Sequence, residues 1–308
     1  MKKDLINLKD LSTKEINGLF DLAFKIKKNR KKYNHDLSGK TLGLLFSKPS
    51  TRTRVSFDVA MNQLGGDTIF LRSEEVQLKR GETLADTAKV LSRYLDGLVI
   101  RTFSHGEVEI LAGESSIPVI NGLTDKYHPC QALADYFTLI EHGKDLKKIK
   151  FAYIGDGNNV CHSLMQGSAK LGVEMWVAVP GGFEPDKDIL CEVSCEADKN
   201  GAKILLTDLP QEAAKNADCI YTDVWVSMGQ EGSENKKIEK FKGFQINRNL
   251  VSLAKKDCVI MHCLPAHREV EITSEVLDSP NSIVWDQAEN RLHLQKAVLL
   301  TLMGDKKI

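Results

Sequence analysis

The sequence predicts two α/β domains, each a doubly wound parallel sheet with helices on both of its faces. Short apolar runs with strand character alternate with longer segments of helical periodicity along the whole chain. This alternation is typical of parallel strands joined by crossover helices. The chain has 308 residues, and one domain usually takes about 150. A polar segment at 143–148 lies near the middle and marks the predicted junction.

The first half contains four predicted strands and four predicted helices. Each strand is a short apolar run that ends at polar residues, glycine or proline, and each is followed by a longer amphipathic pattern. We predict strands at 41–46, 67–71, 97–101 and 118–121, and helices at 13–31, 51–64, 83–95 and 128–142.

The second half repeats the pattern with six predicted strands, at 150–154, 175–179, 203–206, 219–223, 258–263 and 283–285. A final helix is predicted at 287–303, and the pattern alone does not decide on which domain it packs. The resulting division is a first domain over 1–145, a second over 146–286, and a C-terminal helical segment over 287–308.

Composition argues against several classes of protein. Lys plus Arg and Asp plus Glu are both 42, so the chain lacks the basic excess that a nucleic-acid partner usually requires. No apolar run approaches the roughly 18 residues that span a bilayer. The start, Met1-Lys2-Lys3-Asp4-Leu5, lacks the apolar core of a signal peptide, so we expect a cytoplasmic protein without a membrane partner.

The seven cysteines are odd in number and scattered, which argues against a disulfide framework. Cys191 and Cys195 stand one helical turn apart, but no second Cys or His pair follows at the spacing of structural zinc. We therefore expect both to be packing residues and predict no metal site.

Polar clusters follow the predicted strands in both halves of the chain. Ligands of open α/β sheets bind at the carboxyl ends of the strands. Because both halves contribute such clusters, we expect an active site in the cleft between the two domains. The clusters are Ser47–Arg54, Arg101, the loop that reaches His128, Gly155–Asn159, Asp223 and His262–Pro265.

The segment Ser50-Thr51-Arg52-Thr53-Arg54 opens a predicted helix directly after a strand. A helix N-terminus attracts anions, and arginine binds two phosphate oxygens at once. The alternative is that Ser50 only caps the helix and the arginines are solvated. A nucleotide P-loop is excluded, because its glycine-lysine pattern is absent.

Two further residues lie where an anionic substrate can be met. Arg101 ends an apolar strand, so its charge must reach solvent or an anion. His128 precedes Pro129, a residue suited to the first turn of a helix. His128 can donate a hydrogen bond to a substrate oxygen, although a lone histidine is more often a surface or capping residue.

Three segments of the second half leave alternatives open. The loop from Gly155 to Val160 only partly matches a dinucleotide fingerprint, and the next strand ends without the acidic residue that binds a ribose. Asp223 is suited to hold an ammonium group or to cap a loop. Cys263 can be a nucleophile, a base or a buried packing residue.

Four motifs together resemble those of the ornithine carbamoyltransferases, within the aspartate/ornithine carbamoyltransferase family. The first two are shared with the aspartate enzymes, whereas the last two mark the ornithine enzymes. The resemblance runs nearly end to end and implies carbamoyl transfer to the δ-amine of L-ornithine, without a metal or organic cofactor, in a homotrimer. The motifs are Ser50-Thr51-Arg52-Thr53-Arg54, His128-Pro129-Cys130-Gln131, Asp223-Val224-Trp225-Val226-Ser227-Met228-Gly229 and His262-Cys263-Leu264-Pro265.

The resemblance assigns one set of residues to carbamoyl phosphate. Arg101, Thr53 and His128 would polarise the carbamoyl oxygen, Gln131 and the Leu264 carbonyl would receive the carbamoyl NH2, and Gln77 would come from a neighbouring subunit. Arg291 would complete this site, which implies that the last helix returns to the first domain. The whole set is Ser50, Thr51, Arg52, Thr53, Gln77, Arg101, His128, Pro129, Cys130, Gln131, Cys263, Leu264 and Arg291.

The resemblance assigns a second set to ornithine. Asn159 and the Met228 amide would bind the α-carboxylate, and Asp223 and Ser227 the α-ammonium. Cys263 would lie near the attacking δ-amine.

Three other functions compete with carbamoyl transfer to ornithine as an interpretation of the sequence. They are an aspartate-type carbamoyltransferase, an NAD-dependent oxidoreductase and a non-catalytic anion-binding protein. Asp223 would repel a dicarboxylate, and the missing ribose acid argues against NAD.

Overall fold

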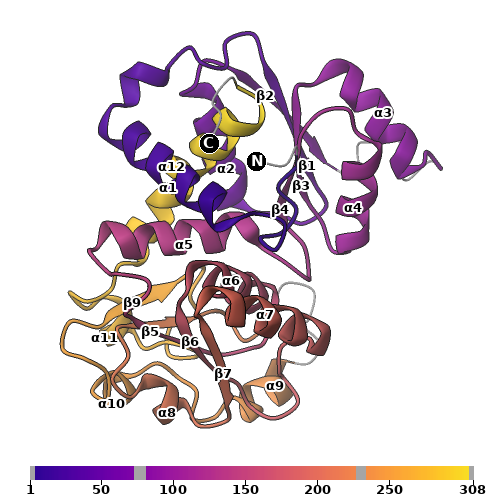
Figure 1. The fold of residues 1–308 in the computed structure, drawn as a ribbon. Coiled ribbons are helices and arrows are strands. Elements are labelled where there is room, and N and C mark those ends of the chain that lie inside the picture. Colours follow the sequence, from indigo (N-terminus) through magenta and orange to yellow (C-terminus); the bar gives the residue numbers. More distant parts are fainter. Residues whose placement is uncertain (1–3, 73–80, 227–233, 305–308) are drawn as a thin grey trace. The chain divides into compact units, whose positions relative to one another are not determined.

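The computed structural model describes residues 4–72, 81–226 and 234–304. The chain divides into two compact units, with Met1–Phe137 and Asn290–Ile308 in unit 1 and Thr138–Glu289 in unit 2 (Figure 1). Each unit contains one parallel sheet. The predicted fold class, two α/β domains with parallel sheets, is confirmed.

Unit 1 has a four-stranded sheet in the order β2-β1-β3-β4. Helices α3 and α4 pack on one face of it, where Ala88 and Val108 join a core with Leu45, Leu98 and Ile100. The strands are β1 (Thr41–Phe46), β2 (Asp67–Arg72), β3 (Gly97–Arg101) and β4 (Val119–Leu123), and the helices are α1 (Thr13–Lys28), α2 (Thr51–Asn62), α3 (Leu84–Tyr94) and α4 (His105–Glu114), with a 3-10 turn η1 (Arg30–Tyr33). Helix α5 (Pro129–Glu141) belongs to unit 1 up to Phe137 and to unit 2 from Thr138.

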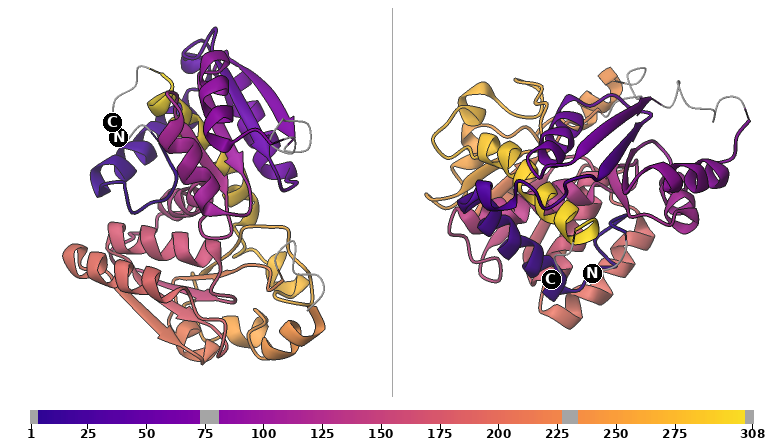
Figure 2. Two further views of the ribbon diagram at one scale, coloured as in Figure 1. Left: turned by 90° about the vertical axis from the view of Figure 1, so that its right-hand side faces the viewer. Right: turned by 90° about the horizontal axis from the view of Figure 1, so that it is seen from above.

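The last helix, α12 (Val284–Leu302), enters unit 1 at Asn290. It runs beside α1 and α2 in the views of Figures 1 and 2. Hydrogen bonds from Lys27 to Asn290 and from Arg291 to Thr53, each 2.9 Å, fix it there. The C-terminal residues therefore belong to the same compact unit as α2.

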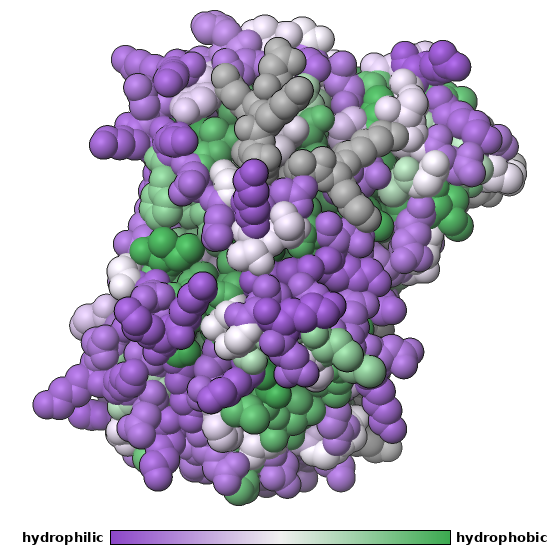
Figure 3. All heavy atoms as spheres, in the orientation of Figure 1, coloured by the Kyte–Doolittle hydropathy of each residue, from purple (hydrophilic) through white to green (hydrophobic). Residues whose placement is uncertain are grey.

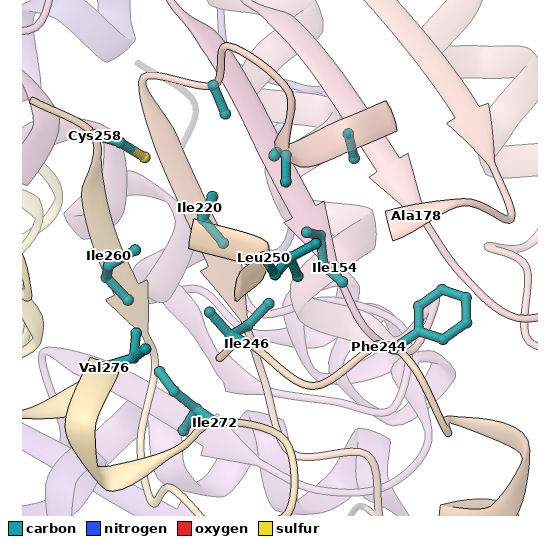
Figure 4. Close-up of a cluster of buried hydrophobic side chains, with 14 of the residues drawn as sticks. Ile154, Ala178, Ile220, Phe244, Ile246, Leu250, Cys258, Ile260, Ile272 and Val276 are labelled. Atoms are coloured by element: carbon teal, nitrogen blue, oxygen red, sulfur yellow. The ribbon is translucent and has the colours of Figure 1, made fainter. Parts of the chain in front are cut away.

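Unit 2 has a five-stranded sheet in the order β7-β6-β5-β8-β9. Figure 4 shows part of its apolar core, in which Ile154, Ile220 and Ile260 from three adjacent strands meet Leu250 and Ile272. The strands are β5 (Lys150–Ile154), β6 (Glu174–Ala178), β7 (Lys203–Thr207), β8 (Cys219–Thr222) and β9 (Val259–His262), and the helices are α6 (Asn159–Leu171), α7 (Lys187–Asn200), α8 (Pro210–Ala214), α9 (Glu234–Lys240), α10 (Arg248–Val251) and α11 (Ser274–Leu277).

Nine of the predicted strands are present with bounds that agree within two residues, and one is wrong. Residues 283–285 were expected to form a strand, but α12 begins at Val284. Only Ser282, just before this run, makes an isolated bridge to Ile260 of β9. A run of three apolar residues is too short to distinguish helical periodicity from the alternation of a strand.

The expectation that Cys191 and Cys195 pack in the interior is also wrong, because both are exposed. The buried face of α7 consists of Ile189, Val193 and Ala197. The two cysteines lie on the other side of the same helix.

The face drawn in Figure 3 is mostly polar, with small apolar groups between charged side chains. Within the described ranges, no helix combines the length and the apolar character that crossing a membrane would need.

Candidate active site

The segment from Ser50 to Arg54 lies at the N-terminus of α2, at the predicted start of a helix. Ser50 caps this helix, and its hydroxyl accepts a 3.2 Å hydrogen bond from the Thr53 amide. The two arginines of the motif differ in their surroundings. Arg54 is exposed, and its guanidinium lies 3.8 Å from the ring centroid of Phe70 on β2. Arg52 instead adds its charge to that of two buried arginines.

Arg52, Arg101 and Arg291 form the arginine cluster of unit 1. Arg101 ends β3 and is buried, and burial together with the charges of Arg291 and Arg52 lowers its pKa to about 10. Arg291 is buried too and donates to the Thr53 hydroxyl at 2.9 Å. Two buried like charges with a third, half-buried one beside them are costly unless an anion joins them. The cluster is therefore suited to bind a dianion such as phosphate.

His128 is buried beside this cluster, directly before Pro129 at the start of α5. Burial and the charges of Arg291, Arg101 and Arg52 hold the pKa of His128 well below its ordinary value. The imidazole is therefore neutral at pH 7. A neutral imidazole can donate one hydrogen bond to a substrate oxygen.

Gln131 is the third residue of α5 and is 1% exposed. Its amide nitrogen donates to the Asp135 carboxylate at 2.8 Å. Because an ionised carboxylate only accepts hydrogen bonds, this contact fixes which way the amide points. The Gln131 amide oxygen has no hydrogen-bond partner among the described residues. It is the kind of group that can receive an NH2 from a bound molecule.

Cys130 faces away from solvent and is fully buried. Its thiol donates to the Asn121 carbonyl at 3.6 Å, and burial raises its pKa to about 12. The side chain is therefore a neutral packing group, and any contact of Cys130 with a ligand would come from its backbone.

In unit 2, Asp223 follows β8 and is buried. One carboxylate oxygen of Asp223 accepts hydrogen bonds from the backbone amide of the next residue, Val224, at 2.7 Å and from the Cys263 thiol at 2.8 Å. The other oxygen accepts from the Asn158 side chain at 2.8 Å. Asn158 also caps α6, of which Asn159 is the first residue. The ends of β5, β8 and β9 thus meet around one carboxylate.

His262 ends β9, directly before Cys263, and both of its ring nitrogens make hydrogen bonds. Its Nδ1 accepts from the Leu264 amide at 2.8 Å, so the proton is on Nε2, which donates to Glu271 at 3.1 Å. Asp223, His262 and Cys263 offer ligand atoms within 4.8 Å of one another. Since both nitrogens of His262 are engaged, these three residues are not a ready metal site. Leu264 itself has a positive φ of 57°, a strained conformation often found at functional sites.

Three of the predicted site residues, Gln77, Ser227 and Met228, lie outside the described residues. Within unit 1, α2, β3, α5 and α12 bring together Thr53, Arg101, His128 and Arg291. Within unit 2, Asp223 and Cys263 come together.

Several supporting residues were missed by the sequence analysis. Asp135 stands four residues after Gln131, so helical spacing gave a signal for that pair. Lys48 had no such signal. It forms an ion pair with Asp125, beyond β4, and lies 4.0 Å from the ring centroid of Phe103, beyond β3. It thereby ties together three loops at the carboxyl edge of the unit 1 sheet.

Comparisons with known proteins agree with this arrangement. Residues 3–141 match the family model described as "Aspartate/ornithine carbamoyltransferase, carbamoyl-P binding domain", and residues 147–302 match the "Asp/Orn binding domain" of the same family. An ornithine carbamoyltransferase of Bacillus thuringiensis is 56% identical over 300 residues, which are 97% of this chain and 94% of that protein.

Solved structures are similar as well. The ornithine carbamoyltransferase of Pyrococcus furiosus superposes with a TM-score of 0.95 at 52% identity, covering 99% of this chain and 98% of that one. The enzyme of Gloeobacter violaceus gives a TM-score of 0.90 at 47% identity, covering 99% of both chains. The motifs, the fold and these matches agree, and the chain belongs to the aspartate/ornithine carbamoyltransferase family.

Proposed function

We propose that the protein is an ornithine carbamoyltransferase (EC 2.1.3.3), which transfers the carbamoyl group of carbamoyl phosphate to the δ-amine of L-ornithine and yields L-citrulline and phosphate. The observation that carries this proposal is the arginine cluster, with Arg101 and Arg291 buried, beside the neutral His128. The cluster suits the phosphate, and the imidazole suits the carbonyl next to it. Relatives named ornithine carbamoyltransferase support the choice of acceptor.

The carbamoyl-phosphate site is assigned mainly to unit 1. The N-terminus of α2 and the arginine cluster hold the phosphate. The Gln131 amide oxygen and the Leu264 carbonyl accept the carbamoyl NH2. The full set we propose is Ser50, Thr51, Arg52, Thr53, Gln77, Arg101, His128, Pro129, Cys130, Gln131, Cys263, Leu264 and Arg291.

The residues promote catalysis mainly at the carbamoyl oxygen, which becomes negatively charged as the amine attacks. Arg101, Thr53 and His128 donate hydrogen bonds to it in the tetrahedral intermediate, where such donors have their largest effect. The new bond joins the δ-nitrogen to the carbamoyl carbon, the bond from that carbon to the phosphate oxygen breaks, and the phosphate accepts the amine proton. Carbamoyl phosphate is already activated, so the residues supply position and charge.

The acceptor site is assigned to unit 2. Asp223 and Ser227 hold the α-ammonium of ornithine, and Asn159 and the Met228 amide hold its α-carboxylate. Cys263 lies near the δ-amine. That amine has a solution pKa of about 10.4, like lysine, and must be neutral to attack. Asp223 would repel the second carboxylate of aspartate, which argues against the aspartate-type reaction.

One assay tests the assignment. The protein is incubated with carbamoyl phosphate and, separately, L-ornithine, L-aspartate, putrescine and N-acetylornithine, while released phosphate and the carbamoylated product are measured. We expect citrulline from ornithine and little product from the others. Phosphate release with aspartate alone, or none with any amine, would contradict the proposal.

We further propose a homotrimer in which Gln77 serves a neighbouring subunit's site, by the resemblance of its motif. Subunits carrying Arg52→Ala and subunits carrying Gln77→Ala are unfolded, mixed and refolded together. Hybrid trimers would then contain some intact shared sites and recover activity that neither variant shows alone. The mass of the assembly in solution, measured by light scattering, tests the trimer separately.

None of the seven cysteines forms a disulfide, which fits a reducing compartment such as the cytoplasm. We place the reaction there, in arginine biosynthesis or, run in reverse, in arginine breakdown.

A further inference from the structure

A buried ion pair stands beside the acceptor carboxylate of unit 2. Lys237 of α9 donates to Asp156, in the turn between β5 and α6, at 2.7 Å. Their side chains are only 9% and 13% exposed. The Lys237 ammonium also lies 5.3 Å from the ring centroid of Phe183 and 5.9 Å from that of Phe241. Desolvation largely cancels the attraction within such a pair, so stability alone does not explain it.

The turn that carries Asp156 is held rigidly. Tyr153 donates to the Asp156 carbonyl at 2.7 Å. Gly157 packs so closely on the chain at 183–185 that a Cβ there would lie 2.4 Å from the Pro185 nitrogen. Two residues after Asp156, Asn158 donates to Asp223. The Asp156 carboxylate therefore keeps a fixed place near Asp223.

The groups that interact with Asp156 come from several elements. They are Lys237 on α9, Tyr153 on β5, Cys161 on α6 and Asp223 after β8, and Cys263 after β9 interacts with Tyr153. Burial raises the pKa of Asp156, the Asp223 charge adds to that rise, and Lys237 opposes it. Burial holds the pKa values of Tyr153 and Cys161 well above their ordinary values, so both stay neutral. Lys237 thus supplies the positive charge of this group.

We propose that Lys237 is a positioning residue that neutralises Asp156, so that Asp223 is the one uncompensated carboxylate that the described residues offer to the acceptor. This inference rests on the proposed function. An acceptor that carries one ammonium and one neutral amine then matches the site. A second uncompensated carboxylate would instead stabilise the diammonium form of the acceptor, whose δ-nitrogen has no lone pair for attack.

The test compares Lys237→Met, Asp156→Asn and the double variant. In Asp156→Asn the Lys237 charge no longer faces a charged Asp156 and competes with the substrate ammonium for Asp223, so we expect KM for ornithine to rise about tenfold. KM for carbamoyl phosphate should stay within about twofold. In the double variant both charges are gone, and KM for ornithine should return to within about threefold of wild type.

Lys237→Met should change how kcat/KM for ornithine depends on pH. Its kcat/KM for ornithine, divided by that of wild type, should fall as the pH rises, because burial and the Asp223 charge raise the pKa of Asp156 and Lys237 no longer opposes that rise. The same ratio should be flat for the double variant. Lys255→Met is the matched control, because Lys255 pairs with Asp218 at 2.8 Å next to the opposite end of β8. It should leave both KM values unchanged.

A purely structural role of Lys237 predicts different results for these variants. The double variant would then be as impaired as the worse single variant, or the two KM values would rise together, and either outcome overturns the inference. If wild type itself makes no citrulline from ornithine, the proposed function fails, which is a separate result. Should Lys237→Met not fold, Asp156→Asn and the neutral double variant still decide between the two accounts.

Discussion

Arg52 and Arg54 offer a comparison between two arginines of one motif. Arg54 is exposed and stacked on Phe70, whereas the charge of Arg52 reaches Arg101 and His128. Charge-assisted hydrogen bonds to a desolvated phosphate are strong, so Arg52→Ala should lower kcat/KM for carbamoyl phosphate by more than about a hundredfold. Arg54→Ala should lower it less than about fivefold. Steady-state kinetics of both variants decide the assignment, and equal losses would contradict it.

Asp223 is held by Asn158 and Cys263 in a buried place. Asp223→Asn keeps the shape and removes the charge that we assign to the ornithine ammonium. A buried charge pair that loses one partner loses several kcal/mol, so affinity for ornithine should fall by about a hundredfold or more. Affinity for carbamoyl phosphate, measured by calorimetry without ornithine, should hardly change. An equal loss for both substrates would make Asp223 a structural residue.

Cys263 is predicted to orient the acceptor without forming a covalent intermediate. Its contact with the Asp223 carboxylate requires a protonated thiol, which is a poor nucleophile. His262 cannot act as its base, because both ring nitrogens are engaged by Leu264 and Glu271. Cys263→Ser should therefore keep measurable activity, with a raised KM for ornithine.

Inactivation by thiol-modifying reagents is a second test of the role of Cys263. They should inactivate the wild-type enzyme, and bound ornithine should protect it. Trapping a carbamoylated Cys263 that goes on to citrulline at the rate of turnover would overturn the prediction.

At the scale of elements, the buried strands were the easiest to predict. β1, β3 and β5 have the predicted bounds because each is a short apolar run closed by polar residues. α4 was missed, and the start of α12 was taken for a strand, because Val284 and Trp285 are apolar neighbours without a visible period. The site residues at strand ends were predictable from local pattern. Pairs such as Lys237 with Asp156, 81 residues apart, were not.

α12 also buries a lysine that the sequence did not single out. Lys296 is 1% exposed and donates to the side chain of Gln63, at the end of α2. Burial, with a contribution from the Arg30 charge, lowers its pKa from 10.5 to about 8. The unfolded chain therefore binds more protons than the folded one between those two values. The contribution of Lys296 to stability should rise with pH through that window.

Lys296→Met tests this assignment. At pH 7 the variant should have a higher free energy of unfolding in urea than wild type, because a buried charge has been removed. The difference should shrink as the pH rises from 8 toward 10. Lys89→Met, at an exposed residue paired with Glu114 at 3.2 Å, is the control and should show no such trend. A difference that is constant with pH would contradict the lowered pKa.

At the scale of the whole molecule, each unit has its own sheet and its own core, and each gathers polar residues at the carboxyl edge of its sheet. Sequence periodicity could predict this division because every strand and crossover helix is local. The charge balance of each unit was harder to predict. It depends on which charges become buried together, such as the arginines of unit 1 and the Asp156, Lys237 and Asp223 group of unit 2.

The charge of the arginine cluster should make the stability of unit 1 depend on a bound anion. The cluster holds two buried arginines and a half-buried one, so an anion that binds only the folded form should stabilise unit 1. A ligand at 100 times its Kd contributes about 2.7 kcal/mol, or roughly a hundredfold slower exchange for amides that exchange only on unfolding. Inorganic phosphate should therefore slow hydrogen exchange in β1, β3 and α5 of unit 1, measured by mass spectrometry. Arg52→Ala should lose this protection and Asp223→Asn should keep it, because Asp223 belongs to unit 2. Protection that is equal in both units, or unchanged in Arg52→Ala, would show that phosphate acts elsewhere than at the cluster.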